Sequence, residues 1–88
     1  MIACLRREDV LAQEAHGQTV LPRVGDGSYY TLDDVDAVIW GLCDGQTSLP
    51  AIVEAVCAEF AAEPGVVRAD LEEFLADLET EGLLDRLA

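Results

Sequence analysis

The chain has 88 residues, which is enough for one small domain, and we expect residues 1–88 to form a single unit. Its hydrophobic fraction of 51% can supply a core, so the net charge of −13 does not indicate a disordered acidic tail. The same charge excludes nucleic acid and other polyanions as expected partners, and it favours partners that carry Lys or Arg.

The three cysteines do not form a pattern that is typical of a metal site. Cys4, Cys43 and Cys57 include no CxxC pair, and the single His16 is distant from all three in sequence. Cys43 and Cys57 fall on the apolar faces of predicted helices, so reduced thiols in the core of a cytoplasmic protein are expected. A nucleophilic cysteine is the alternative, but His16 lies in a predicted turn and is poorly placed as its base. We therefore predict no metal and no cofactor.

No segment predicts contact with a membrane. The chain has no run close to the ~20 apolar residues of a membrane-spanning helix. Residues 1–5 are too short for a signal sequence, and two acidic residues, Glu8 and Asp9, follow directly.

The first third of the chain has the pattern of a three-stranded antiparallel meander. The predicted strands are Val10–Ala15, residues 18–24 (QTVLPRV) and residues 28–32 (SYYTL). Turns are predicted at His16-Gly17 and at residues 25–27 (GDG), because Gly tolerates a positive φ.

Two segments fit the meander less well. Residues 1–8 are expected to be a flexible lead-in. Pro22 lacks a backbone donor, so in a middle strand it predicts either a bulge or a nitrogen position that faces no partner.

After Leu32 the hydrophobic period becomes helical, and three helices are predicted. Asp33 is the expected N-cap of the first, with Asp36 in its first turn, and Asp44-Gly45 is the expected stop. The second is capped by Thr47 or Ser48, with Pro50 in its first turn. The three apolar stripes are Val35, Val38, Ile39 and Leu42; Leu49, Ile52, Val53, Val56, Cys57 and Phe60; and Val67, Leu71, Phe74, Leu75 and Leu78.

The ends of the second and third helices also carry signals. Pro64-Gly65 is expected to break the second helix. Gly82 is expected to end the third, and Leu83 and Leu84 are expected to pack back onto it. The fold class is therefore predicted as α+β and winged helix-turn-helix-like, a three-stranded meander followed by three helices.

The charge of the third helix argues against a DNA-binding version of this fold. A recognition helix needs Lys and Arg to meet phosphates, and this helix offers only Arg68. The opposing carboxylates are Asp70, Glu72, Glu73, Asp77, Glu79 and Glu81. A winged-helix transcription factor is thus a disfavoured alternative.

No catalytic constellation is present in the sequence. It has no Ser/His/Asp set, no phosphate-binding loop and no dinucleotide fingerprint, and its carboxylates fall mostly on solvent faces of helices. An acyl-carrier interpretation fails because residues 47–50 (TSLP) lack the Asp that precedes the attachment serine. We expect a protein that is not an enzyme.

Three motifs in order resemble one family. They are residues 27–33 (GSYYTLD), residues 39–45 (IWGLCDG) and residues 70–84 (DLEEFLADLETEGLL). Together they resemble the PqqD-like family of precursor peptide recognition elements for ribosomally made, modified peptides. The resemblance runs from Asp9 to Leu84, and Pro22 departs from the usual strand.

The resemblance implies a non-catalytic adaptor. Such domains bind the leader segment of a precursor peptide as a strand added beside the third strand, with leader side chains in a groove against the third helix. A discrete chain of this size is most similar to the recognition element of lasso peptide biosynthesis. That implies presentation to a transglutaminase-like cysteine protease, the leader peptidase, and to a macrocyclase. Two alternatives stay open: a peptide chaperone for pyrroloquinoline quinone biosynthesis, and a structural or regulatory subunit that pairs through its edge strand.

The residues support this interpretation independently, because a meander leaves an unpaired edge that can accept another strand. If the third strand is that edge, its backbone groups come from Ser28, Tyr29, Tyr30 and Thr31. The groove is predicted along one flank of the third helix, with an apolar floor that also competes for a place in the core. The flank residues are Val66, Asp70, Glu73 and Asp77, and the floor residues are Val67, Leu71 and Phe74.

Overall fold

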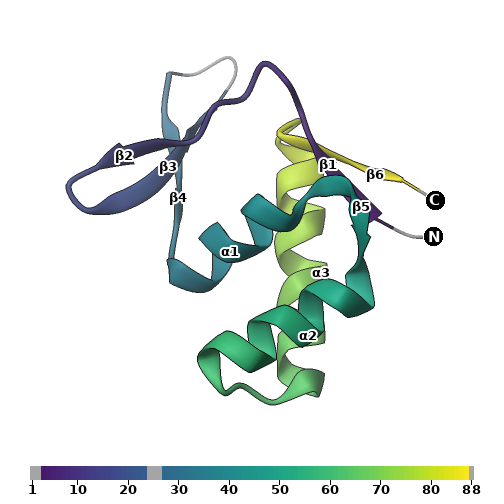
Figure 1. The fold of residues 1–88 in the computed structure, drawn as a ribbon. Coiled ribbons are helices and arrows are strands. Elements are labelled where there is room, and N and C mark those ends of the chain that lie inside the picture. The colour runs from purple at the N-terminus through teal and green to yellow at the C-terminus, as the bar shows by residue number, and fades with distance from the viewer. Residues whose placement is uncertain (1–2, 24–26, 88) are drawn as a thin grey trace.

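The computed structural model describes residues 3–23 and 27–87, which form an α+β fold with two small antiparallel sheets and three helices (Figure 1). The predicted α+β class is confirmed, but the sequence does not predict a second sheet. The elements in chain order are β1 (Ala3–Arg6), β2 (Gln13–Ala15), β3 (Gln18–Pro22), β4 (Tyr29–Leu32), α1 (Asp34–Leu42), β5 (Asp44–Ser48), α2 (Leu49–Phe60), α3 (Pro64–Thr80) and β6 (Leu84–Leu87).

The predicted meander is present, with strand order β2-β3-β4 and antiparallel pairing throughout. Its strands are shorter than predicted: the first begins at Gln13 rather than Val10, because β2 pairs with β3 only as far as Val20. His16 and Gly17 form the predicted turn, with φ values of 54° and 78°. Residues 25 and 26 of the second predicted turn, at residues 25–27, lie outside the described residues.

Pro22 fits the sheet because of where its nitrogen points. It pairs with Tyr29 of β4, whereas β2 ends opposite Val20. The next residue, Arg23, donates its N–H to the Ser28 carbonyl at 2.8 Å. Since hydrogen-bonding directions alternate along a strand, the Pro22 nitrogen points away from β4, beyond the end of β2. The prediction of a nitrogen position without a strand partner is confirmed.

The second sheet has the order β5-β1-β6 and uses segments for which the sequence predicts other roles. Residues 1–8 are predicted to be a flexible lead-in, but β1 is the central strand of this sheet, and Ala3 and Cys4 are buried. Leu83 and Leu84 are buried as predicted, and the chain then continues as β6 and pairs with β1 along its whole length. The pairing joins the two ends of the chain, and each strand has only four residues.

The start of β5 corrects a predicted helix stop. α1 ends at Leu42 with Cys43 as its C-cap, so Asp44 and Gly45 open a strand instead of closing the helix. Gly45 has a φ of +77°, and a Cβ at this position would lie 3.3 Å from Leu5 Cδ1 and 3.4 Å from Leu87 Cδ1. Its conformation and its surroundings both favour glycine.

The Gly45→Ala variant is expected to lose about 1 kcal/mol of unfolding free energy, because a side chain at positive φ is strained. Urea unfolding followed by circular dichroism measures this. Gly41→Ala is the matched control, since Gly41 lies in α1 and a Cβ added there would meet nothing within 4 Å. It is expected to gain stability, because Ala favours a helix interior. Equal effects of the two changes would contradict this account of β5.

Side-chain caps begin the first two helices as predicted. Asp33 Oδ1 accepts a hydrogen bond from the Asp36 N–H at 2.7 Å, and Ser48 Oγ accepts one from the Ala51 N–H at 3.2 Å. α2 ends earlier than predicted, at Phe60, because Ala61 adopts a left-handed conformation; Pro64 then begins α3 rather than breaking α2.

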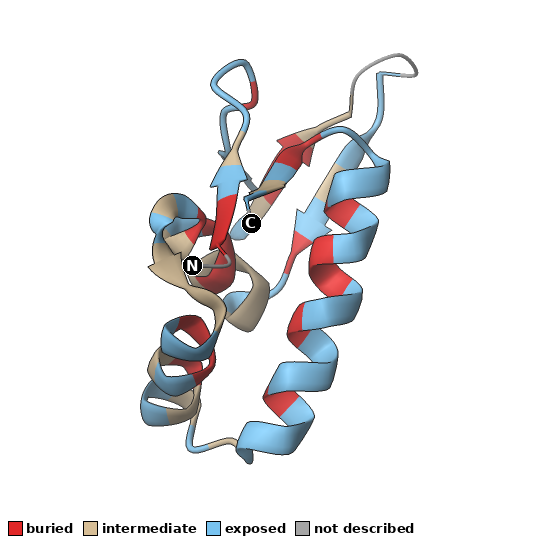
Figure 2. Cartoon of the chain, turned by 90° about the vertical axis from the view of Figure 1, so that its right-hand side faces the viewer, coloured by how far each residue is buried: buried red, intermediate tan, exposed pale blue. Residues whose placement is uncertain are grey.

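The core lies between the helices and both sheets (Figure 2). The apolar stripe predicted for α3 is confirmed, since its five members Val67, Leu71, Phe74, Leu75 and Leu78 are all buried. Cys4 and Cys43 are buried free thiols and Cys57 is half-buried, although Cys43 follows α1 instead of lying on its stripe.

Candidate functional site

β4 is an edge strand of the meander, as the strand-addition interpretation requires of the third strand, and β2 is the other edge. Ser28 accepts a hydrogen bond from Arg23, so alternation directs the backbone groups of Ser28, Tyr30 and Leu32 toward β3. The N–H and C=O groups of Tyr29 and Thr31 point the other way, toward the open edge. Of the four residues predicted to supply backbone groups there, these two are placed to do so.

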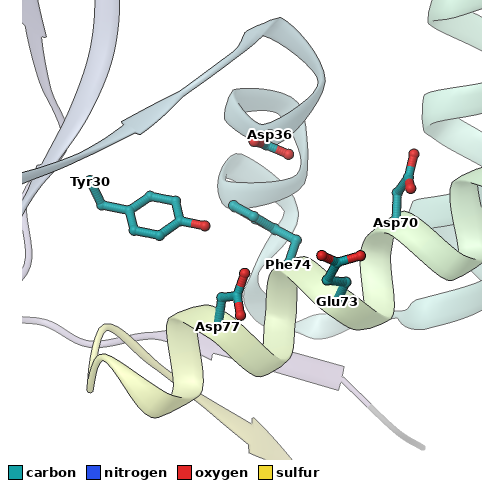
Figure 3. Close-up of a pocket in the computed structure, with 6 residues that line it drawn as sticks. All are labelled: Tyr30, Asp36, Asp70, Glu73, Phe74 and Asp77. Carbon is teal, nitrogen blue, oxygen red and sulfur yellow. The ribbon is translucent and has the colours of Figure 1, made fainter.

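A groove of about 230 Å³ lies beside this edge, between β4, α1 and α3. Figure 2 shows β4 running alongside α3. The lining side chains, drawn in Figure 3, are Tyr30 from β4, Asp36 from α1, and Asp70, Glu73, Phe74 and Asp77 from α3. The groove therefore combines an open strand edge, an aromatic pair and four carboxylates.

The aromatic pair holds the groove's apolar part in place. The rings of Tyr30 and Phe74 have centroids 6.3 Å apart and are inclined at 60°, a favourable tilted contact. Arg23 covers Tyr30, with its guanidinium carbon 5.3 Å from the ring centroid, and its Nε lies 3.9 Å from Glu81 Oε2. Tyr30 thus contacts both Phe74 and Arg23, and Phe74 is only 6% exposed.

The structure brings together five of the predicted site residues, namely Tyr30, Asp70, Glu73, Phe74 and Asp77. It does not place Val67 and Leu71 on an accessible floor: they are 5% and 1% exposed, because their side of α3 packs into the core. Val66 is 56% exposed, but it does not line the groove.

Asp36 is a groove residue that the sequence analysis does not assign to the site. Its sequence position indicates only a first-turn acid of α1. Because β4 leads into α1 through the single residue Asp33, the first turn of α1 must lie next to the Tyr30 side of the strand. Asp36 follows closely after the edge strand and the Asp33 cap. This short spacing is the sequence signal that could have predicted its place in the groove.

The surroundings of Asp36 disfavour its negative charge. Burial is the main cause, and the charges of Asp33 and Asp70 add to it, so the pKa of Asp36 rises to about 6. A hydrogen bond from the Asp33 backbone opposes this rise. Burial also raises the pKa of Tyr30, with further contributions from the Asp77 and Asp36 charges. The groove is therefore partly dehydrated and strongly negative.

Two negative findings concern the described residues. Within residues 3–23 and 27–87, no group of three His, Cys, Asp or Glu side chains is arranged to hold a metal ion. Over the same ranges, none of the helices has both the length and the apolar character that crossing a membrane would require.

Comparison with known proteins identifies the family. The model of the family described as coenzyme PQQ synthesis protein D (PqqD) matches residues 18–84, and the chain belongs to this family. The predicted resemblance is thereby confirmed. No significant match was found among curated protein sequences.

One solved structure is similar over nearly the whole chain: TbiB1 in complex with the TbiA(beta) leader peptide. It shares 32% sequence identity with a TM-score of 0.75, and the alignment covers 96% of this chain and 98% of that one. Because the alignment covers nearly all of both chains, it includes the groove elements β4, α1 and α3.

Proposed function

We propose that this chain is a non-catalytic adaptor that binds the leader segment of a ribosomally made precursor peptide by strand addition to β4. One observation carries the proposal: the open edge of β4 lies against the Tyr30–Phe74 groove, in a chain whose solved relative is bound to a leader peptide. Backbone pairing supplies affinity, and pockets for alternate side chains supply specificity.

The geometry of β4 defines how a leader strand would bind. Its backbone pairs with the outward groups of Tyr29 and Thr31. Because side chains alternate across a sheet, the leader residue opposite Tyr30 shares the face of Tyr30 and points into the groove. The residues on either side of it point toward solvent with Tyr29, which is 56% exposed.

The adaptor's role is to present the leader to processing enzymes. In this proposal residues 1–88 act as one recognition domain in the cytoplasm, with a winged helix-turn-helix arrangement in which α2 and α3 are the helix pair and the meander is the wing beside α1 and α3. The partners are a transglutaminase-like leader peptidase and a macrocyclase of a lasso pathway. Tethering raises the effective concentration of the precursor at these enzymes.

A second candidate pathway is favoured by the description of the family model, which names coenzyme PQQ synthesis. In that case the same groove binds the precursor of the quinone cofactor. The leaders of the two pathways differ. A panel of leader peptides from both pathways therefore distinguishes the two candidates, because the chain should bind the leader of its own pathway.

Fluorescence polarisation with labelled leader peptides, taken from precursor genes adjacent to the gene for this chain, tests the proposal. We expect saturable binding that Asp70→Lys weakens by roughly tenfold, since the change reverses a charge on the groove. Glu54→Lys is the matched control: it makes the same charge change on the exposed side of α2 and should leave binding unchanged.

Circular dichroism establishes that both variants are folded. Absence of binding to every leader by the folded protein would contradict the proposal. If the chain instead dimerises without peptide in analytical ultracentrifugation, the edge-pairing subunit becomes the better account. Equal weakening by both variants would mean that the attraction is a general effect of charge and not of the groove.

A further inference from the structure

None of the five basic side chains lines the groove, although Arg23 lies over the Tyr30 ring beside it. All five are Arg, and there is no Lys. Arg68 lines a separate cavity with Leu49 and Pro50. The others are engaged as follows: Arg6 donates to the Trp40 and Gly41 carbonyls, Arg7 pairs with Asp9, Arg23 pairs with Glu81, and Arg86 pairs with Glu72 and Glu79.

This distribution makes the two flanks of α3 different. On the flank away from the groove, Arg86 Nη1 lies 3.1 Å from Glu72 Oε2, and Arg86 Nε lies 3.9 Å from Glu79 Oε1. On the groove flank, no salt bridge among the described residues involves Asp70, Glu73 or Asp77. Asp36 adds a fourth carboxylate from α1 across the groove. Four carboxylates that take part in no salt bridge among the described residues therefore face the groove where the leader strand would lie.

The aromatic pair gives this negative site a shape that suits a long basic side chain. Figure 3 shows the Tyr30 ring extending from β4 toward α3, with Asp36 on one side and Asp77 on the other. Lys and Arg have apolar stems that can pack on aromatic rings while the charged group reaches nearby carboxylates.

We propose that the groove selects Lys or Arg at the leader residue that pairs with Tyr30, and that Asp36 is the residue that sets this preference. The basic stem packs on Tyr30 and Phe74, and its charged group lies among Asp36, Asp70 and Asp77. This inference rests on the proposed function, since it needs a leader strand beside β4.

The protonation of Asp36 gives a second consequence. In the free protein its pKa is about 6, and a bound cation would lower it. The ionised form then binds more tightly, so affinity rises between pH 5 and pH 7 and is lost as pH falls through 6. The other groups that face this carboxylate are Asp33, the N-cap of α1; Asp70, Glu73 and Asp77 on α3; and Tyr30 with its Arg23–Glu81 pair.

The test selects peptides from a random library, so it requires no leader sequence. An mRNA-display library of random twelve-residue peptides is selected against the full chain, and we expect binders with Lys or Arg at one fixed position. For a synthetic binder, replacing that residue by Met and changing Asp36→Asn should each weaken binding about tenfold. Because the proposal places these two groups in contact, the two changes together should weaken binding only slightly more than either change alone.

The control is Asp34→Asn, which removes an exposed carboxylate from the same first turn of α1 and should leave binding and its pH dependence unchanged. Asp36→Asn should flatten the rise in affinity between pH 5 and pH 7. Two results would overturn this inference but not the proposal of leader binding. One is the selection of binders that pair with β4 without a preference for Lys or Arg, and the other is additive effects of the two changes. Failure to enrich any binder to the folded chain would overturn both.

Discussion

Thr31→Pro is expected to abolish leader binding while the chain stays folded. The Thr31 N–H points to the open edge of β4, so proline removes a donor that no strand of the meander uses. Its ring also occupies the space of the incoming strand. The lost hydrogen bond and the steric conflict together should weaken binding by at least roughly thirtyfold, or about 2 kcal/mol. Fluorescence polarisation with the labelled leader measures the loss.

Two further variants make this result specific to strand addition. Thr31→Val keeps the backbone donor and should bind nearly as wild type. Tyr30→Pro removes a donor on the β3 side of the same strand, so it should lower the unfolding temperature, which Thr31→Pro should leave nearly unchanged. Leader binding by a folded Thr31→Pro variant at wild-type affinity would exclude pairing along this edge.

Leu75→Ala is expected to cause the largest loss of stability, because Leu75 is fully buried on the α3 face that packs into the core. Truncation of a buried leucine costs about 2–5 kcal/mol. A domain of this size has only about 4–13 kcal/mol of unfolding free energy in total. The variant should therefore unfold at much lower urea concentration, as measured by circular dichroism.

Leu11→Ala is the matched control for this change, since Leu11 is 70% exposed. The same truncation there should cost less than about 0.5 kcal/mol. Similar losses for the two variants would mean that α3 does not pack as the structure shows.

The meander and the helices could be predicted because their signals are local. Turn residues such as His16-Gly17, the Asp33 cap and the period of the α3 stripe each act over a few positions. The second sheet has no such signal. Its strands have four or five residues, and Ala3 pairs with both Ser48 and Leu87, so the pattern emerges only when distant segments meet.

The same limit applies to the site. The angle around α3 correctly separates Asp70, Glu73 and Asp77 from the opposite flank. It does not decide whether apolar residues of the stripe face the groove or the core, and only Phe74 lines the groove. Asp36 escapes prediction because its place depends on how α1 packs beside β4, a tertiary relation that helical periodicity does not carry.

The most direct measurement is amide hydrogen exchange of the isotope-labelled chain by NMR, with and without the leader peptide. The proposed function predicts that the Tyr29 and Thr31 amides exchange at least roughly tenfold more slowly in the complex, because they gain strand partners. The Tyr30 and Leu32 amides, which already face β3, should change little. Unchanged exchange at Tyr29 and Thr31, with new protection in β5 or β6, would contradict leader binding at this edge.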